Sequence, residues 1–175
     1  ISANISTFKR KITSLPESVL TGYPGDPANG KSILGHSDLA QFGFVADGIF
    51  KSQDEVDNHA IQNGKGIGRI RYKDIGGLDE NGKYVNIPDG QINDLDRTWI
   101  GDANPDYELG FNSTFTYKGF DLNIFFQGVK GVDVYNEYKH LTDFSSIWPG
   151  GNYGSRTLNA WSPENPNSTI PAVTL

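Results

Sequence analysis

The sequence predicts an all-β protein, and three observations lead to that expectation. The chain of 175 residues contains 21 Gly, 9 Pro, 10 Phe and 8 Tyr, a composition typical of short strands joined by many turns. Apolar and polar residues alternate over 107–117 and again over 120–129, which is the period of a strand with two different faces. Segment 52–62 alone has the pattern of a helix.

Charge and composition exclude several classes of protein. The net charge of −6, from 15 basic and 21 acidic residues, argues against a nucleic-acid binder, which would carry a basic stripe. The absence of cysteine excludes disulfides and thiolate sites. No apolar run is long enough for a transmembrane helix, and no signal peptide is visible. A chain of this length without methionine suggests a piece of a longer product.

The first half of the chain predicts loops and one short helix. Residues 16–48, like residues 131–157 further on, are rich in Gly, Pro, Asn and Asp and are predicted to be loops. Segment 52–62 predicts a helix with Ser52 as its N-cap and Glu55 at the capping-box spacing. Its thin apolar face consists of Val56, Ala60 and Ile61.

A β-hairpin over 107–129 is the clearest feature of the sequence. Apolar residues occupy odd positions before Lys118-Gly119 and even positions after it. A two-residue turn there would place on one face the pairs Tyr117–Phe120, Phe115–Leu122 and Phe111–Phe126, and on the other Thr116–Asp121 and Thr114–Asn123. Because the phase change matches the turn length, the register is predicted together with the strands. Phe125 is the one residue out of phase.

Two interpretations of this hairpin stay open on the pattern alone. The apolar face packs on the core of a soluble sandwich, or it faces lipid while the polar face lines a wet lumen. Eleven residues at about 3.3 Å each, tilted by about 45°, span about 25 Å, the height of the apolar band of an outer-membrane barrel. Tyr107, Tyr117 and Phe120 lie near the strand ends, where aromatic girdles sit.

Six sequence blocks, in this order, carry a resemblance to a known family: GFVADGIFKSQDEVDNHA (43–60), GRIRYKD (68–74), DGQINDLDRTWIG (89–101), NPDYELGFN (104–112), YKGFDLNIFFQGVKGVDVYN (117–136) and WSPENPNSTIP (161–171). Together they closely resemble the C-terminal part of the SusC/RagA family of TonB-linked outer-membrane transporters. The resemblance covers most of the chain and is weakest in 9–40 and 137–158. It implies that the chain is part of a 22-stranded transmembrane antiparallel β-barrel with an N-terminal plug and long extracellular loops.

The resemblance also implies a function. The whole protein would import large nutrients, oligosaccharide or peptide, across the outer membrane of a member of the Bacteroidetes. TonB would act through a part N-terminal to Ile1, and a SusD-like lipoprotein would cover the barrel from outside. Outer-membrane lipid would be a further partner, and nucleic acid would not. No enzyme activity is implied, and the sequence does not identify the substrate.

Under this resemblance the chain is laid out in five parts. Residues 1–8 form a strand, with Ile1, Ala3 and Ile5 on one side; 9–106 form a large extracellular loop region; 107–130 form a transmembrane hairpin; 131–157 form a second extracellular loop; and 158–175 return to the barrel. The turn at Lys118-Gly119 would face the periplasm.

An interrupted calcium-loop pattern lies in the first loop region. In the family, a stretch resembling RYKDxNGDGxIxxxDR forms a compact loop whose Asp and Asn side chains bind Ca²⁺. Here Asp74 matches the first position, and Asp89, Gly90, Ile92 and Asp96 match later ones, but IGGLDENGKYVNI is inserted between them.

Two hypotheses for this pattern stay open. In the first, Ca²⁺ is the candidate cofactor and its ligands are Asp74, Asp89 and Asp96. A compact loop ending at these positions is not possible, because its first and third positions, counted back from Asp89, are Val85 and Ile87, which cannot be side-chain ligands. Asp79 or Asn81 could fold back to complete the site. Alternatively, Asp89-Gly90 is a β-turn and Asp96 pairs with Arg97 or caps the segment of Trp99.

Aromatic residues crowd the second loop: Tyr135, Tyr138, Phe144, Trp148, Tyr153 and Trp161. Tyr135, Tyr138, Trp148 and Tyr153 are the candidates for contact with substrate or partner, since rings stack on sugars and grip peptides. The other interpretation is that these rings pack the loop onto itself or onto the lipoprotein. Trp161 belongs to WSPENP and is predicted to order the return of the loop to the barrel.

No catalytic constellation is found. GKGIG (64–68) lacks the remainder of a phosphate loop, and His36, His59 and His140 are widely separated and show no metal-ligand spacing. The main alternative function is of another class: an autonomous soluble β-module that binds carbohydrate or calcium at a cell surface.

Overall fold

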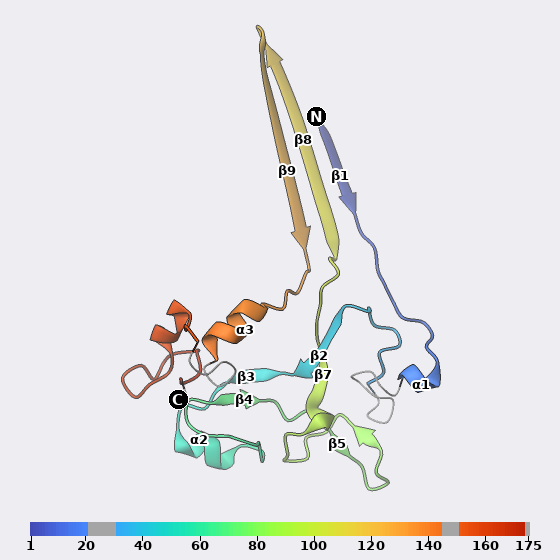
Figure 1. Ribbon diagram of the computed structural model, residues 1–175. Helices are drawn as coiled ribbons and strands as arrows, with labels where there is room; N and C mark the ends of the chain where they lie inside the picture. Colours follow the sequence, from blue (N-terminus) through green and yellow to red (C-terminus); the bar gives the residue numbers. More distant parts are fainter. Residues whose placement is uncertain (21–30, 145–150, 174–175) are drawn as a thin grey trace. The chain divides into compact units, whose positions relative to one another are not determined.

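The computed structural model describes residues 1–20, 31–144 and 151–173, and it divides into two compact units. The described residues of 1–42, together with 99–134, form the first unit. Residues 43–98 and the described residues of 135–175 form the second. Most of the regular structure is strand, and the helices are few and short (Figure 1).

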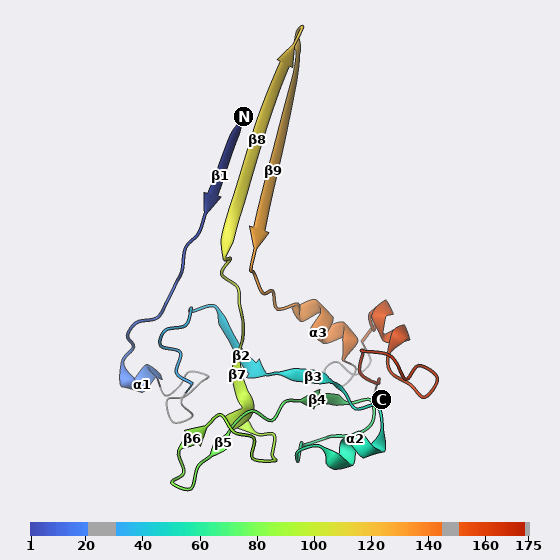
Figure 2. The same cartoon turned by 180° about the vertical axis from the view of Figure 1, so that it is seen from behind.

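An antiparallel sheet of three strands dominates the first unit. Its order is β1-β8-β9, formed by β1 (Ser2–Ser6), β8 (Tyr107–Tyr117) and β9 (Phe120–Lys130). β8 and β9 run side by side as a long hairpin in both views (Figures 1 and 2). Lys118 and Gly119 form the turn, with φ of 46° and 84°. Positive φ at both central residues gives a tight turn whose twist matches that of the two strands.

The predicted hairpin register is confirmed. The structure pairs Tyr117 with Phe120, Phe115 with Leu122, Phe111 with Phe126, Thr116 with Asp121 and Thr114 with Asn123. On the other edge of β8, β1 places Ala3 opposite Phe111 and Ile5 opposite Leu109. Side chains directly opposite each other share a face, so the first strand extends the apolar face of the hairpin.

The predicted helix is present but shorter. α2 spans Gln53–Asn58, and Ser52 caps it by accepting a hydrogen bond from the backbone N–H of Glu55 at 3.2 Å. The Glu55 carboxylate accepts from the backbone N–H of Lys51 at 2.7 Å. The chain turns extended at His59, so of the predicted apolar face only Val56 lies within the helix.

The two stretches predicted as loops contain regular elements. Residues 16–48 include α1 (Glu17–Leu20), β2 (Ala40–Phe44) and most of β3 (Ala46–Ile49), and 131–157 include α3 (Glu137–Asp143) and the start of η3 (Ser155–Asn159). The loop prediction was therefore too coarse. β2 pairs with β7 (Arg97–Asp102), far along the chain, and such a partner is invisible in local composition. α3 is capped by Asn136, whose side chain accepts from the Lys139 N–H at 2.9 Å.

The second unit has short strand pairs around a small core. β3 pairs with β4 (Ile70–Tyr72), and β5 (Gly77–Leu78) pairs with β6 (Tyr84–Val85). Among the residues described in this unit, Ile49, Phe50 and Val56 are buried apolar residues, with Phe50 fully enclosed. A single turn of 3-10 helix, η2 (Asp94–Asp96), leads into β7. In the parts of the chain that are described, no helix has the length and apolar character needed to cross a membrane.

Candidate functional site

One face of the three-stranded sheet is largely apolar, and the residues that the structure describes leave it uncovered. Leu109, Phe111, Phe115, Leu122 and Phe126 point to this face and are between 39% and 62% exposed. The rings of Phe111 and Phe126 meet across the strands at 6.3 Å. The polar exceptions are Ser113, which is buried, and Lys130 at the open end. Monomeric soluble proteins rarely expose contiguous apolar surface of this kind, so the face requires a cover of lipid or protein.

The opposite face of the same sheet is polar. It presents Ser2, Asn4, Ser6, Glu108, Asn112, Thr114, Thr116, Asp121, Asn123 and Gln127. Two apolar residues also lie on this face: Phe125, out of phase in the sequence, is opposite Asn112 and 65% exposed, and Val129 is opposite Glu108 and 54% exposed. A sheet with one apolar and one polar face, neither packed on a core, is suited to separate lipid from water.

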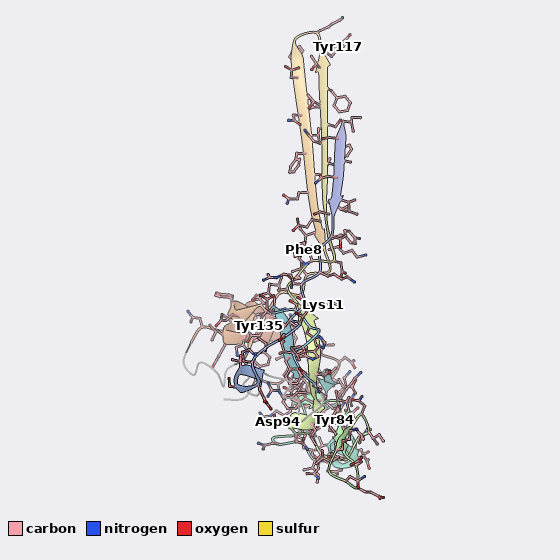
Figure 3. The ribbon with its side chains drawn as sticks, turned by 90° about the vertical axis from the view of Figure 1, so that its right-hand side faces the viewer. Phe8, Lys11, Tyr84, Asp94, Tyr117 and Tyr135 are labelled. Atoms are coloured by element: carbon pink, nitrogen blue, oxygen red, sulfur yellow. The ribbon has the colours of Figure 1, made fainter. Side chains whose placement is uncertain are left out.

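Aromatic and basic residues mark both ends of the apolar face. At the turn, the Lys118 ammonium lies 5.2 Å from the centroid of the Tyr117 ring, and at the open end the Lys130 ammonium lies 5.8 Å from that of Tyr107. Figure 3 shows Tyr117 at the turn and Phe8 near the opposite end of the sheet. Aromatic rings with adjacent lysines are typical of the levels where an apolar band meets water.

In the second unit, the residues of the interrupted calcium pattern lie in one loop, residues 74–97, which we call the carboxylate loop. The Asp74 carboxylate accepts hydrogen bonds from the backbone N–H groups of Asp89 at 3.2 Å and Gly90 at 2.7 Å. The Asp89 carboxylate accepts from the Gln91 N–H at 2.9 Å, and Gly90 has a φ of +83°. Asp74 therefore ties the first residues of the loop to the turn at 89–90.

Asp96 ties the loop together from its other end. Its side chain is completely buried. One carboxylate oxygen accepts from the backbone N–H groups of Ile75 at 2.8 Å and Gly76 at 3.1 Å, and the other accepts from Asn93 at 2.8 Å. These three donors satisfy a charge that would otherwise be costly to bury. Arg97, a partner considered for Asp96 from the sequence, instead lies 3.6 Å from Asp94.

The three predicted calcium ligands thus share a loop, but each carboxylate accepts from a different set of backbone N–H groups. Within residues 1–20, 31–144 and 151–173, no group of three or more acidic or histidine side chains is placed to hold a metal ion. A calcium site requires several oxygens converging on one point at about 2.3 to 2.6 Å, and the hydrogen bonds do not create that arrangement. Calcium binding by Asp74, Asp89 and Asp96 stays a prediction.

The aromatic candidates for substrate or partner contact are exposed where they are described. Tyr135, Tyr138 and Tyr153 are 59%, 79% and 40% exposed, and Trp148 lies outside the described residues. Tyr138 also lines a small pocket of about 200 Å³ with Leu141 and Thr142 of α3. Exposed rings beside a pocket are available for stacking, and their role in binding stays a prediction.

Trp161 is packed within the second unit. A Cβ atom on Gly68 would lie 2.7 Å from the Trp161 ring and 2.7 Å from Ala172. Backbone hydrogen bonds join Trp161 to Ile170 at 2.8 Å and Ala172 to Gly68 at 2.8 Å, so this segment closes over a glycine. Nearby, hydrogen bonds from its own backbone N–H and from Ser162 hold the pKa of the exposed Glu164 carboxyl below its usual range.

Sequence reasoning missed a polar pocket where the sheet ends. The pocket has a volume of about 450 Å³, and Lys9, Arg10 and Lys11, just beyond β1, line one side of it. Arg10 forms an ion pair with Asp38 at 2.7 Å. A run of basic residues immediately after an apolar strand was the sequence feature that could have drawn attention to this pocket.

Comparisons with known proteins give a consistent result. No protein-family model matches the chain. Two similar curated proteins come from Formosa agariphila: TonB-dependent receptor P26, 32% identical over 148 residues and 82% of this chain, and TonB-dependent receptor P3, 29% identical over 175 residues and 96% of this chain. The chain spans only 13% and 16% of the length of these two relatives.

A similar fold occurs in a solved structure of the RagAB peptide transporter. The match has a TM-score of 0.61 with 21% sequence identity, and it covers 98% of this chain and 17% of the other. At this identity the likeness concerns the fold.

Proposed function

The chain is homologous to TonB-dependent receptors and fits the SusC/RagA family of these transporters, and from this premise we propose that it forms part of the wall and the outer loops of an outer-membrane nutrient importer. The three-stranded sheet is a stretch of a closed barrel, which in plugged transporters has about 22 strands. The regions 9–106 and 131–157 form extracellular loops.

One observation carries this proposal: a hairpin of full transmembrane length exposes an apolar face and a polar face at once. A strand of 11 residues spans about 25 Å when tilted as barrel strands are. Both outer edges of the sheet, on β1 and on β9, have no further strand in the described chain. Unpaired backbone groups in lipid each cost several kcal/mol, so neighbouring strands of the barrel must pair with both edges.

The remaining parts of the function follow as proposals from the same premise. TonB supplies the energy through another region of the receptor, and a SusD-like lipoprotein covers the outer side. The cargo is an oligosaccharide or a peptide; transport of peptides by the protein with the similar fold supports the second. Tyr135, Tyr138 and Tyr153, together with Trp148, contact the cargo or the lipoprotein. The protein is an importer and not an enzyme.

Lipid contact of the two faces tests the proposal. This chain contains no cysteine, so Phe115→Cys and Thr114→Cys can be labelled with a fluorophore in an otherwise cysteine-free full-length receptor in vesicles. These two neighbours point to opposite faces. We expect brominated lipid to quench the label at position 115 strongly and the label at 114 weakly. Equal quenching, or stronger quenching at 114, would contradict a lipid-facing apolar side.

The alternative function, an autonomous soluble β-module that binds carbohydrate or calcium, requires that water be kept from the apolar face. Its apolar face would have to be covered by the chain itself, and in the described residues Phe115 and Leu122 remain 53% and 56% exposed. A soluble module would also be monodisperse without detergent, whereas a barrel segment with this face uncovered would aggregate.

A further inference from the structure

The apolar face of the sheet is hollowed near its open end. Gly128 pairs with Leu109, and a Cβ at Gly128 would lie 3.9 Å from Leu109, so the missing side chain leaves room above the strand. A groove of about 600 Å³ opens there, bordered by Ala3, Ile5, Leu109, Phe111, Phe126 and Gly128. We call this groove the Gly128 hollow. The four pairs from there to the turn, Phe111–Phe126, Ser113–Ile124, Phe115–Leu122 and Tyr117–Phe120, carry a side chain on both strands.

A lysine stands directly beyond the Gly128 hollow. The next pair toward the open end is Tyr107–Lys130, and because it lies two residues further along each strand, it shares the apolar face. The Lys130 ammonium lies over the Tyr107 ring at 5.8 Å. A long lysine side chain at the edge of an apolar band keeps its stem on apolar surface and carries its charge to the polar boundary.

Further positive charge lies just past the end of β1. Lys9 and Lys11 are exposed, and neither ammonium makes a hydrogen bond or an ion pair with the residues that the structure describes. Arg10 between them is neutralised by Asp38. At the open end of the sheet, the charges of these two lysines are therefore not neutralised by the described protein groups.

Most carboxylates of the polar pocket that Lys9 and Lys11 line accept hydrogen bonds from other groups. Asp133 accepts from the Asp102 N–H at 3.0 Å, and Asp102 accepts from the Asn104 backbone at 2.9 Å and from its side-chain amide at 2.9 Å. The Asp106 carboxylate packs against Gly131. Hydrogen-bonded carboxylates compete less well for the lysines than unpaired ones do.

We propose that the Gly128 hollow and Lys130 form a binding site for one phosphate-bearing membrane lipid. An acyl chain lies in the hollow, and the phosphate lies at Lys130, with Lys9 and Lys11 adding attraction from beyond β1. The inference deepens the proposed function and rests on it, because it requires the apolar face to meet lipid. It differs from general lipid contact in that one acyl chain and one headgroup are held at a defined place.

The turn end of the same hairpin provides a matched control. Lys118 lies over Tyr117 at 5.2 Å, much as Lys130 lies over Tyr107, but the next pair on that face is Phe115–Leu122, which leaves no comparable gap. Basic charge over an aromatic ring is therefore present at both ends, and the hollow is present at one. Lys130→Gln and Lys118→Gln separate a specific site from general attraction to a charged surface.

Native mass spectrometry of the full-length receptor in detergent, titrated with dioleoyl phosphatidylglycerol, tests the site. We expect one tightly retained lipid, with affinity lowered about five- to tenfold by Lys130→Gln and restored by Lys130→Arg. Gly128→Leu, which fills the hollow, should lower affinity at least as much. Lys118→Gln, and Ile124→Leu on the same face, should leave binding unchanged.

Two further probes distinguish the parts of the ligand. Inorganic phosphate and dioleoylglycerol should each compete poorly, because each has only one of the two features. Full competition by phosphate alone would reduce the site to a headgroup site and overturn the proposal. So would equal effects of Lys118→Gln and Lys130→Gln. If the label at position 115 is quenched by brominated lipid but no lipid is retained, this inference fails while the proposed function stands.

Discussion

The three-stranded sheet and the carboxylate loop fix their backbones by opposite means. In the sheet, backbone groups of β1, β8 and β9 pair with one another, and the side chains are left to face their surroundings on both sides. In the loop, side-chain oxygens of Asp74 and Asp96 do the pairing, and Asp96 is completely buried in consequence.

This difference teaches where each region is vulnerable. A residue of the sheet can be substituted without altering the register, because eleven pairs between β8 and β9 specify the register together. The substitution instead changes whether that face of the sheet is stable against lipid or against water. In the loop, one carboxylate holds three backbone N–H groups. A single substitution there removes several contacts at once.

Placing a charge on each face of the sheet should have the largest effect. Phe115→Arg puts a guanidinium near the middle of the apolar face, and we expect it to lower the free energy of unfolding by about 2 to 4 kcal/mol. Thr114→Arg, on the polar face, should cost less than about 1 kcal/mol. Unfolding of the full-length receptor from lipid vesicles, followed by denaturant titration, measures both. A comparable cost at the two positions would show that the faces are not distinguished by lipid.

Removing the charge of Asp96 tests the loop in the same way. Asp96→Asn replaces one acceptor oxygen by a donor that faces backbone N–H groups, and we expect a loss of about 2 to 3 kcal/mol confined to the carboxylate loop. Hydrogen exchange at Ile75, Gly76 and Asn93 should accelerate. Asp89→Asn is the control, since Asp89 is exposed and its carboxylate accepts a hydrogen bond from the nearby Gln91 N–H. If exchange is unaffected by Asp96→Asn, the buried carboxylate does not hold the loop.

The two regions also differ in how far the sequence could predict them. The hairpin follows from alternation over neighbouring residues and from a two-residue turn in which Gly119 readily adopts positive φ, so its register was predictable. Two of the three donors to Asp96 lie 20 and 21 residues before it, beyond an insertion without periodicity. The local feature of the sequence that indicates a structural role for Asp96 is its spacing from Asn93, because the two residues form a capping box in the structure.

Lys130 illustrates the same limit for binding residues. Its place on the apolar face and the pairing of Gly128 with Leu109 follow from the alternation and the predicted register, but the hollow is also bordered by Ala3 and Ile5 of β1, whose pairing with β8 joins distant parts of the chain. The pairing of β2 with β7 likewise depends on residues far apart in the chain. Local patterns thus predicted the strands, and contacts between distant residues determined the rest.

A smaller effect is expected where the second unit closes over glycine. Gly68 has a φ of +77° and its Cβ position lies 2.7 Å from both Trp161 and Ala172, so Gly68→Ala should cost about 1 to 3 kcal/mol through overpacking and backbone strain. Gly66→Ala is a matched control, because its Cβ would meet only Arg69 at 3.6 Å. Tryptophan fluorescence during unfolding reports the change if Trp161 loosens. Equal stability of the two variants would mean that this segment is not tightly seated.

Calcium should have the smallest effect. Asp74 and Asp96 already accept five backbone N–H bonds between them, and these bonds order the loop without a cation. A metal that bound there would have to draw the carboxylates away from those donors, and each lost bond to a charged group costs about 1.5 to 3 kcal/mol. We therefore expect millimolar Ca²⁺ to leave hydrogen exchange of the carboxylate loop unchanged.

The calcium hypothesis makes the contrary prediction, and one variant separates the two. If Asp74, Asp89 and Asp96 bind Ca²⁺, the ion must slow exchange in the loop, and Asp89→Asn must abolish that effect, since a ligand stabilises the folded state according to its affinity. Asp89 is the informative position because its carboxylate accepts a hydrogen bond from Gln91, only two residues away, so the loss of this bond disturbs the loop little without calcium. Protection by Ca²⁺ that Asp89→Asn removes would mean that the carboxylates rearrange around the ion. The loop would then be held by metal in the presence of calcium and by backbone hydrogen bonds in its absence.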